Sequence, residues 1–193
     1  MKLVFFVGTA GTGKSYVSQR LSEHFNWAYL DMDTIGTPFV NKMLEMNGQD
    51  PDDRDSKFYK EHLRDLPYKA TMDVALDNLE AQQNAALIGP FTKELASPDW
   101  IEKVLAERNL SLDTVDVKVI IVEVNNPNVE KERIQERGFE RDNWKLEHWK
   151  EYKSEKKEYH VTWNLPESSV IRFDNSGDLT DEKLQTLIDF VNN

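Results

Sequence analysis

The chain has 193 residues, of which 39% are hydrophobic and 31% charged, a balance that suits one globular domain with a sizeable core. It contains no cysteine, so the sequence excludes disulfides, thiolate metal sites and cysteine nucleophiles. The formal net charge of −11 works against tight binding to nucleic acid, and no apolar run approaches the roughly 20 residues of a membrane helix. With no signal peptide indicated, we expect a cytoplasmic protein without a membrane partner.

The first predicted element is an apolar strand at 3–7, followed at once by the glycine-rich loop Gly8-Thr9-Ala10-Gly11-Thr12-Gly13-Lys14-Ser15. This loop fits G-x-x-x-x-G-K-[ST], in the strand-to-helix setting that the pattern requires. The glycines let backbone N–H groups approach a phosphate, Lys14 would reach the β- and γ-phosphates, and the Ser15 hydroxyl would bind Mg²⁺. The sequence therefore predicts a site for a nucleoside triphosphate.

An apolar residue at every fourth position over 14–25 predicts a helix that packs on the sheet. Residues 27–30 then predict a short buried strand, which leads into Asp31 and Asp33. Two carboxylates two residues apart on an extended chain point to the same side, so both could face the phosphate end of the loop. The alternative is a solvated acidic strand end, but the neighbouring loop favours a functional pair.

The segment 34–84 is charged and helical in pattern, and we expect breaks at Pro38, at 48–53 and at Pro67. An apolar stripe at helical spacing over 72–79 indicates core packing. So long an excursion between two strands predicts a helical flap, and insertions of this kind commonly shape a substrate pocket.

The third predicted strand covers 85–89 and has no aspartate at its end, where a Walker-B strand would carry one. We expect Lys93 and Glu94, which follow this strand, to lie at the surface. Ser97 should then cap a helix whose first residue is Pro98, since proline is well tolerated at that position.

The fourth strand is predicted at 117–124, where the sequence is almost continuously apolar and β-branched. The helix after it should end near 137–138, and it places Arg133 and Arg137 on one face because they are four residues apart. Such arginines suit either a functional surface or an exposed charged helix with ion pairs. For Arg133 the two interpretations are equally open.

Residues 142–159 predict a further helix with an aromatic stripe, which suits core packing better than ligand stacking. His148 and His160 have no companion histidine at metal-ligand spacing, so neither is predicted to bind a metal. A fifth strand at 170–173, a turn, and a final helix capped by Thr180 complete the chain.

Strands that alternate with helices imply a parallel sheet covered by helices on both faces. The order of the loop, the acidic pair, the helical insertion and the arginine-bearing segment resembles the small P-loop kinases, a group that includes shikimate kinase, gluconate kinase, chloramphenicol phosphotransferase, zeta toxins and polynucleotide kinase. The resemblance implies a three-layer P-loop NTPase fold of the α/β class, with a five-stranded parallel sheet in the order 2-3-1-4-5. It also implies a single kinase domain over 1–193, with a substrate flap at about 34–84 and an arginine lid at about 128–145.

The resemblance assigns roles to the acidic pair. Asp31 would hold Mg²⁺ through water, and Asp33 would orient or deprotonate the acceptor hydroxyl. Kinases of the shikimate type also place the metal carboxylate after the second strand, so the missing aspartate of strand three does not argue against Mg²⁺. Which of the two carboxylates binds the metal stays open.

The resemblance also places Arg137 and Arg141 in the lid, where they would meet the transferring phosphoryl group. The turn that begins with Asp174 and Asn175 would contact adenine, and Arg64 would bind substrate. The many acidic residues of the flap disfavour a strongly anionic acceptor such as a nucleoside monophosphate.

Together these features predict an ATP- and Mg²⁺-dependent phosphotransferase that moves the γ-phosphate of ATP to a hydroxyl of a small molecule. Two alternatives stay open: a kinase for nucleic-acid 5′ ends or a nucleotide-sugar, and a nucleotide-binding regulatory module without a transfer reaction. The carboxylate pair and the lid arginines favour catalysis, since a regulatory module would need neither. A monomer and a homodimer are both compatible with the sequence.

Overall fold

The computed structural model describes residues 1–155 and 158–193, except the side chains of Arg141 and Glu155. Its sheet consists of the parallel strands β1 (Lys2–Val7), β2 (Ala28–Asp31), β3 (Ala85–Ile88), β4 (Asp116–Glu123) and β5 (Val170–Asp174). The strand order β2-β3-β1-β4-β5 confirms the predicted topology. In the register of the central strands, Phe5 stands between Leu87 of β3 and Val119 of β4.

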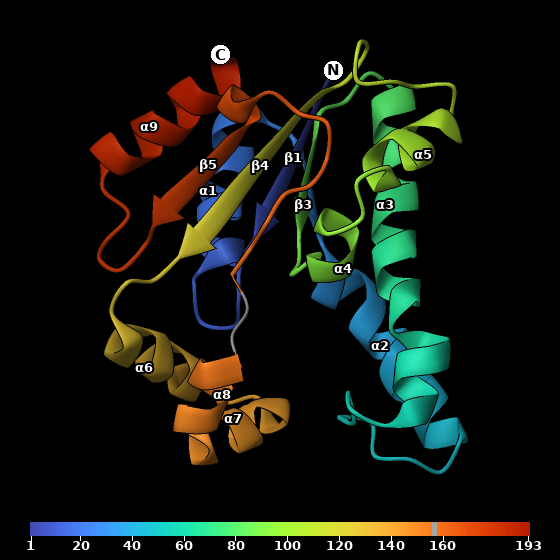
Figure 1. Ribbon diagram of the computed structural model, residues 1–193, viewed down its shortest axis with the longest axis vertical. Helices are drawn as coiled ribbons and strands as arrows, with labels where there is room; N and C mark the ends of the chain where they lie inside the picture. Colours follow the sequence, from blue (N-terminus) through green and yellow to red (C-terminus); the bar gives the residue numbers. More distant parts are fainter. Residues whose placement is uncertain (156–157) are drawn as a thin grey trace.

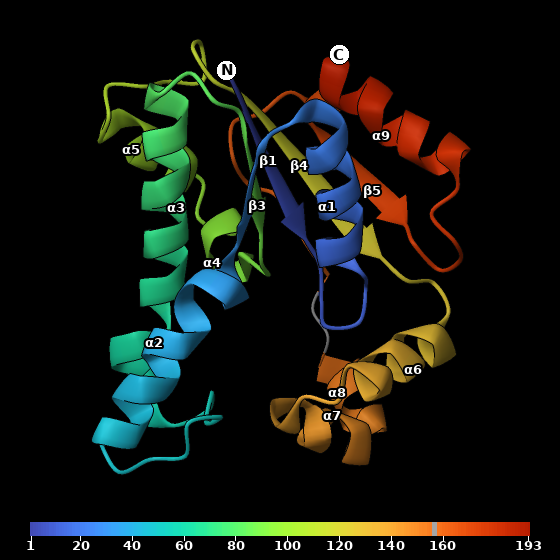
Figure 2. The same cartoon turned by 180° about the vertical axis from the view of Figure 1, so that it is seen from behind.

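Helices cover both faces of this sheet, as Figures 1 and 2 show from opposite sides. One face carries α1 (Lys14–Phe25) and α9 (Asp181–Asn192). The other face carries α3 (Asp65–Glu80), α4 (Thr92–Leu95) and α5 (Trp100–Ala106). The predicted three-layer arrangement is therefore confirmed.

Two helical excursions extend beyond the sheet (Figure 1). The segment between β2 and β3, predicted to be a flap and called the flap below, contains α2 (Met32–Met46), the π-helical turn η1 (Tyr59–Leu63) and α3. The segment after β4, predicted to be a lid and called the lid below, contains α6 (Pro127–Arg137), the 3-10 turn η2 (Glu140–Asp142) and α7 (Asn143–Glu147), and it is followed by α8 (Trp149–Glu155). A second 3-10 turn, η3 (Glu167–Ser169), precedes β5.

The side chains of β1 divide between two hydrophobic cores. Leu3, Phe5 and Val7 join the core under α3 and α5, whereas Val4 and Phe6 join the core under α1 and α9. All five are fully buried, because alternate residues of a central strand point to opposite covered faces. The central strand is thus held from both sides, which fixes the position of the glycine-rich loop that follows it.

Two of the predicted helix breaks are wrong. Pro38 lies inside α2, and Pro67 lies in the first turn of α3, directly after η1. Proline is tolerated in the first turn of a helix, and Gly36 of α2 lets Pro67 come so close that a Cβ on Gly36 would collide with the proline ring. The predicted loop at 48–53 is confirmed.

Several other boundaries also differ from the predictions. The helix predicted from Pro98 begins at Trp100, and its N-cap residue is Asp99 rather than Ser97. The helix predicted over 142–159 is divided into α7 and α8, with a non-helical residue between them. The buried strand predicted at 27–30 is the half-buried edge strand β2.

The aromatic stripe of α7 and α8 is not core, contrary to the prediction. Trp144 is 47% exposed and stacks on His148, with their ring centroids 5.0 Å apart. Trp149 and Tyr152 are half-buried. No helix within 1–155 or 158–193 is long and apolar enough to cross a membrane.

Candidate active site

The glycine-rich loop connects β1 to α1, as predicted, and its glycines are required by the chain around them. Gly11 has a φ of 77°, and a Cβ there would lie 2.7 Å from the carbonyl oxygen of Glu130 in α6. Gly13 has a φ of 82°, and a Cβ there would collide with the side-chain amide of Asn175. Positive φ angles and these close approaches leave glycine as the residue that fits both positions.

The Lys14 ammonium lies within the loop and donates a hydrogen bond to the carbonyl oxygen of Thr9 at 2.8 Å. Burial lowers the pKa of Lys14 to about 8, although the carboxylates of Asp33 and Asp31 act in the opposite direction. The charge of Arg137 lowers this pKa further. The predicted residues from the second strand and from the lid therefore lie close enough to Lys14 to affect its charge state.

Asp31 and Ser15 are in direct contact. The Ser15 hydroxyl donates to Asp31 Oδ2 at 2.9 Å, while Oδ1 accepts the N–H groups of Asp33 at 2.9 Å and of Thr34 at 3.4 Å. Asp31 is thus the N-cap of α2, and Asp33 lies in the first helical turn. The expectation that both carboxylates extend from one strand is wrong, because the chain enters a helix at Met32.

The donor atoms at this position fit Mg²⁺. The Ser15 hydroxyl and the Asp31 carboxylate offer hard oxygen ligands next to the loop that would hold phosphates. In the described part of the chain, no group of three or more His, Cys, Asp or Glu residues could form a complete metal site. Such a sparse set suits Mg²⁺, which keeps several waters and takes its remaining ligands from substrate phosphates.

The lid cations are held by one buried carboxylate. Arg137 Nε donates to Asp142 Oδ2 at 2.6 Å, and Lys145 Nζ donates to Oδ1 at 2.6 Å. Burial alone would raise the pKa of Asp142, but Lys145 and Arg137 outweigh it, so this pKa is lowered. Sequence reasoning did not single out Lys145, although its charge also reaches Lys14. The side chain of Arg141, the second predicted lid residue, lies outside the described residues.

A second buried carboxylate docks the lid on the glycine-rich loop. Glu130 of α6 is fully buried, accepts the Thr9 hydroxyl at 3.0 Å, and accepts Lys153 Nζ of α8 at 2.7 Å. This contact could not be predicted from the sequence, because a glutamate on a charged helix is normally exposed. Glu130 joins the loop, α6 and α8 into one polar network.

Asn175, which lies in the turn predicted to contact adenine, is 3% exposed, and its side chain contacts the glycine-rich loop. Its side-chain amide donates to the Thr12 carbonyl oxygen at 2.9 Å. Arg133 in turn donates to the Asn175 carbonyl oxygen at 2.8 Å, so it is neither a free arginine nor part of an exposed ion-paired face. Asp174 is exposed and accepts the hydroxyl and backbone N–H of Ser176.

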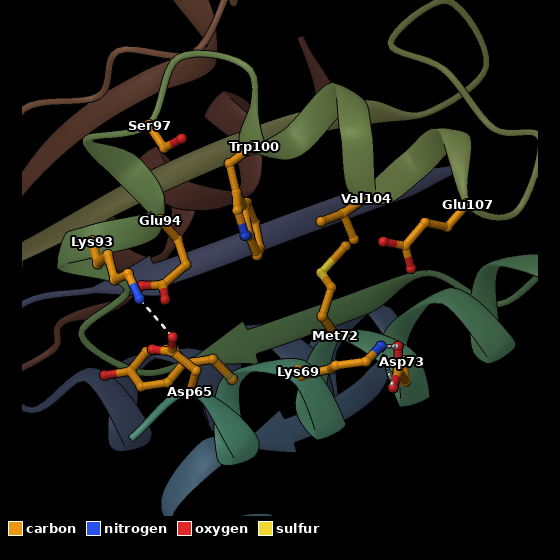
Figure 3. A pocket seen from close by; sticks show the side chains of 11 residues that line it. Asp65, Lys69, Met72, Asp73, Lys93, Glu94, Ser97, Trp100, Val104 and Glu107 are labelled. Atoms are coloured by element: carbon orange, nitrogen blue, oxygen red, sulfur yellow. Dashed lines mark hydrogen bonds and ion pairs between the residues drawn. The ribbon is translucent and has the colours of Figure 1, made fainter. Parts of the chain in front are cut away.

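Arg64 lies at the junction of η1 and α3, and both residues that accept its hydrogen bonds are acidic. It donates to Glu94 at 2.5 and 3.3 Å and to Asp65 at 2.8 Å, while its guanidinium lies 3.9 Å from the centre of the Tyr68 ring. The surface position predicted for Glu94 is wrong, because Glu94 is 5% exposed. Figure 3 shows Glu94 and Lys93 of α4 opposite Asp65 of α3, with Lys93 paired to Asp65.

Cavities lie beside the glycine-rich loop, between the flap and the lid, and between α3 and α5. A cavity of about 630 Å³ lies beside the loop and is lined by Thr9, by Thr92, Leu95 and Ala96, and by 158–160. A second, of about 290 Å³, lies between flap and lid and is lined by Thr37, Asp52 and 138–140. A groove of about 320 Å³ lies between α3 and α5 and is lined in part by Glu94 of α4 and by Trp100 (Figure 3).

Searches against protein-family models and against curated proteins found no match. Solved structures do match over nearly the full chain. A presumed kinase from Chloroflexus aurantiacus has 14% identity and a TM-score of 0.63, with 99% of this chain and 96% of that chain covered. A sugar kinase from Janibacter has 13% identity and a TM-score of 0.57, covering 99% and 94%. Shikimate kinase from Bacteroides thetaiotaomicron has 12% identity and a TM-score of 0.52, covering 100% and 99%.

These likenesses agree with the strand order and with the position of the loop between β1 and α1. Identities this low establish the fold and leave the reaction open. The chain therefore has the fold of the small P-loop kinases.

Proposed function

We propose that the chain is an ATP- and Mg²⁺-dependent kinase that transfers the γ-phosphate of ATP to a hydroxyl group of a small molecule. The observation that supports this best is the group of charges that act on Lys14: Asp31 at the end of β2, Asp33 in the first turn of α2, and Arg137 and Lys145 from the lid. Carboxylates near the phosphate loop suit activation of a hydroxyl, and lid cations suit the charge of a transferring phosphoryl group. A module that only binds nucleotide would need neither the carboxylates nor the lid cations.

On the donor side, the loop amides, the N-terminus of α1 and Lys14 would hold the triphosphate. Lys14 would exchange the neutral Thr9 carbonyl for phosphate oxygens, which accept a stronger, charge-assisted hydrogen bond. Ser15 and Asp31 would hold Mg²⁺, which when bound neutralises charge on the β- and γ-phosphates. The turn that begins with Asp174 and Asn175 would contact adenine, and the Asn175 side chain also donates to the Thr12 carbonyl oxygen of the loop.

On the acceptor side, Asp33 is the proposed base. It would take the proton of the acceptor hydroxyl, whose oxygen bonds to the γ-phosphorus while the bond from that phosphorus to the ADP oxygen breaks. The products are ADP, the phosphorylated acceptor and one proton. The flap at about 34–84 would form the acceptor pocket within a single kinase domain over 1–193.

The lid at about 128–145 would close over the phosphates. Arg137 would then exchange Asp142 for oxygens of the transferring group, which is also the role proposed for Arg141. Because Glu130 already docks α6 on the loop, this exchange requires local rearrangement around η2 rather than movement of the whole lid. Closure would exclude water and so protect ATP from hydrolysis.

The test compares the wild type, Lys14→Ala and Lys103→Ala, an exposed lysine of α5 that serves as a matched control. Binding of Mg·ATP and release of ADP in the presence of a pooled metabolite extract are measured for each. We expect binding and extract-stimulated ADP release in the wild type and control, and loss of both in Lys14→Ala. Binding without any stimulation would instead support the regulatory module.

A further inference from the structure

Arg64 lies where the flap meets the carboxyl ends of β2 and β3. Pro67, one turn after Arg64, packs against Gly36 of α2, and Gly89 at the end of β3 would place a Cβ 3.4 Å from Met32. Met32 directly precedes Asp33, the proposed base. The base of the flap, which carries Arg64, therefore packs beside the strand ends that lead into Asp33 and Gly89.

The charge of this guanidinium is already neutralised. Glu94 and Asp65 both accept hydrogen bonds from it, the Tyr68 ring covers one of its faces, and its side chain is only 18% exposed. Burial by itself would lower the pKa of Arg64, but the bonds to Glu94 and its other partners outweigh it and raise this pKa. Arg64 therefore stays charged, and its charge is balanced within the protein.

Glu94 keeps Arg64 in this state. Its side chain is 6% exposed, and an acid that displaced it from Arg64 would leave a buried carboxylate without its cation, which is strongly unfavourable. The neighbouring ammonium of Lys93 is also occupied, since it pairs with Asp65 at 2.5 Å. The base of the flap thus offers no unbalanced positive charge to an acidic acceptor.

α4 connects this pair to the cavity beside the loop. Thr92, Leu95 and Ala96 lie on one face of the short helix and line the cavity of about 630 Å³ next to Thr9. Lys93 and Glu94 lie on the opposite face, against α3 (Figure 3). Among the lining residues that the structure describes, the charged side chains of this cavity and of the flap–lid cavity are Glu158, Asp52 and Glu140.

We propose that the acceptor is a neutral or amine-bearing hydroxyl compound without carboxylate or phosphate groups, and that Glu94 determines this specificity by neutralising Arg64. The inference rests on the proposed kinase function and deepens it. It assigns Arg64 a structural role at the flap base instead of the substrate-binding role expected from its position in the sequence.

Three probes that differ only at one carbon test the proposal: gluconate, glucitol and 1-amino-1-deoxyglucitol. Binding is measured by calorimetry with Mg²⁺ and a non-hydrolysable ATP analogue present. We expect gluconate to bind the wild type most weakly of the three. In Glu94→Gln the released guanidinium should strengthen gluconate binding by about tenfold or more, with the affinity for the ATP analogue unchanged.

The double variant Arg64→Gln/Glu94→Gln is the matched control, because it removes both charges and should lose the gain for gluconate. If Glu94→Gln does not fold, Glu94→Asp replaces it and should show a smaller gain in the same direction. The proposal is overturned if the wild type prefers gluconate to glucitol, or if no Glu94 variant gains affinity for gluconate. Failure of the wild type to bind the ATP analogue would instead reject the kinase function itself.

Discussion

Replacing Lys14 by methionine should stabilise the free protein while it destroys the nucleotide site. Burial holds the pKa of Lys14 at about 8, against an ordinary value of 10.5. A shift of this size corresponds to about 3 kcal/mol, and partial exposure to solvent reduces the expected cost to about 1–3 kcal/mol. Methionine has a similar shape and no charge, and the Thr9 carbonyl that Lys14 releases still accepts the Thr12 hydroxyl at 3.0 Å.

The sign of this effect depends on pH. Because the pKa of Lys14 is lower in the folded protein than in the unfolded chain, the cost is fully present below pH 8 and disappears as the pH rises beyond 10.5. At pH 7, Lys14→Met should therefore increase the free energy of unfolding and raise Tm by about 2–4 °C per kcal/mol gained. Near pH 10 most of this difference should be gone.

Urea and thermal unfolding without nucleotide, at neutral pH and at about pH 10, measure both quantities. Lys103→Met on the exposed face of α5 is the control and should change little at either pH. A destabilised Lys14→Met, or a gain that is equal at the two pH values, would refute the reasoning, since the cost would then not come from the buried charge.

Three further predictions concern the site. Asp33→Asn should lower kcat by about 10²-fold or more and leave Mg·ATP binding intact, with Asp189→Asn of α9 as control; loss of ATP binding would identify Asp33 as the metal residue. The affinity for Mg·ATP should fall above about pH 8, because Lys14 of the free protein is then largely neutral and must take up a proton when the nucleotide binds. Calorimetry in two buffers of different ionisation enthalpy detects this proton uptake. An affinity that does not change with pH would contradict the prediction. Glu130→Gln should weaken the contact of α6 with the loop by about 1–3 kcal/mol and increase amide exchange there, and unchanged exchange would show that other contacts hold the lid.

The elements that sequence reasoning predicted well are those whose signal is local. The loop pattern names four positions within eight residues, and the apolar strands β1 and β4 are buried on both faces, so their composition alone identifies them. The resemblance to the small P-loop kinases supplied the strand order, which the structure confirms. Local patterns failed in the two flap helices, where Pro67 of α3 packs against Gly36 of α2 and Pro38 lies inside α2.

The contacts that the sequence could not predict join residues far apart in the chain. Asn175 reaches Thr12 across 163 positions, and Glu130 reaches Thr9 across 121. A buried carboxylate has no sequence signature of its own, since the same residue on a helix surface is the commoner case. Glu94 is an example of a buried carboxylate without a sequence signature, because its neighbours in the chain suggest a surface residue. Its burial is possible because it pairs with Arg64, which is distant in the chain.

The kinase proposal is tested most directly by incubating the protein with Mg²⁺ and ATP whose γ-phosphate carries ¹⁸O, together with a metabolite extract and a panel of hydroxyl-bearing antibiotics. Mass spectrometry then searches for a compound that has gained one labelled phosphate. We predict such a product with the wild type and none with Lys14→Ala. Nucleotide binding with labelled phosphate found only as inorganic phosphate or unreacted ATP would contradict a small-molecule kinase.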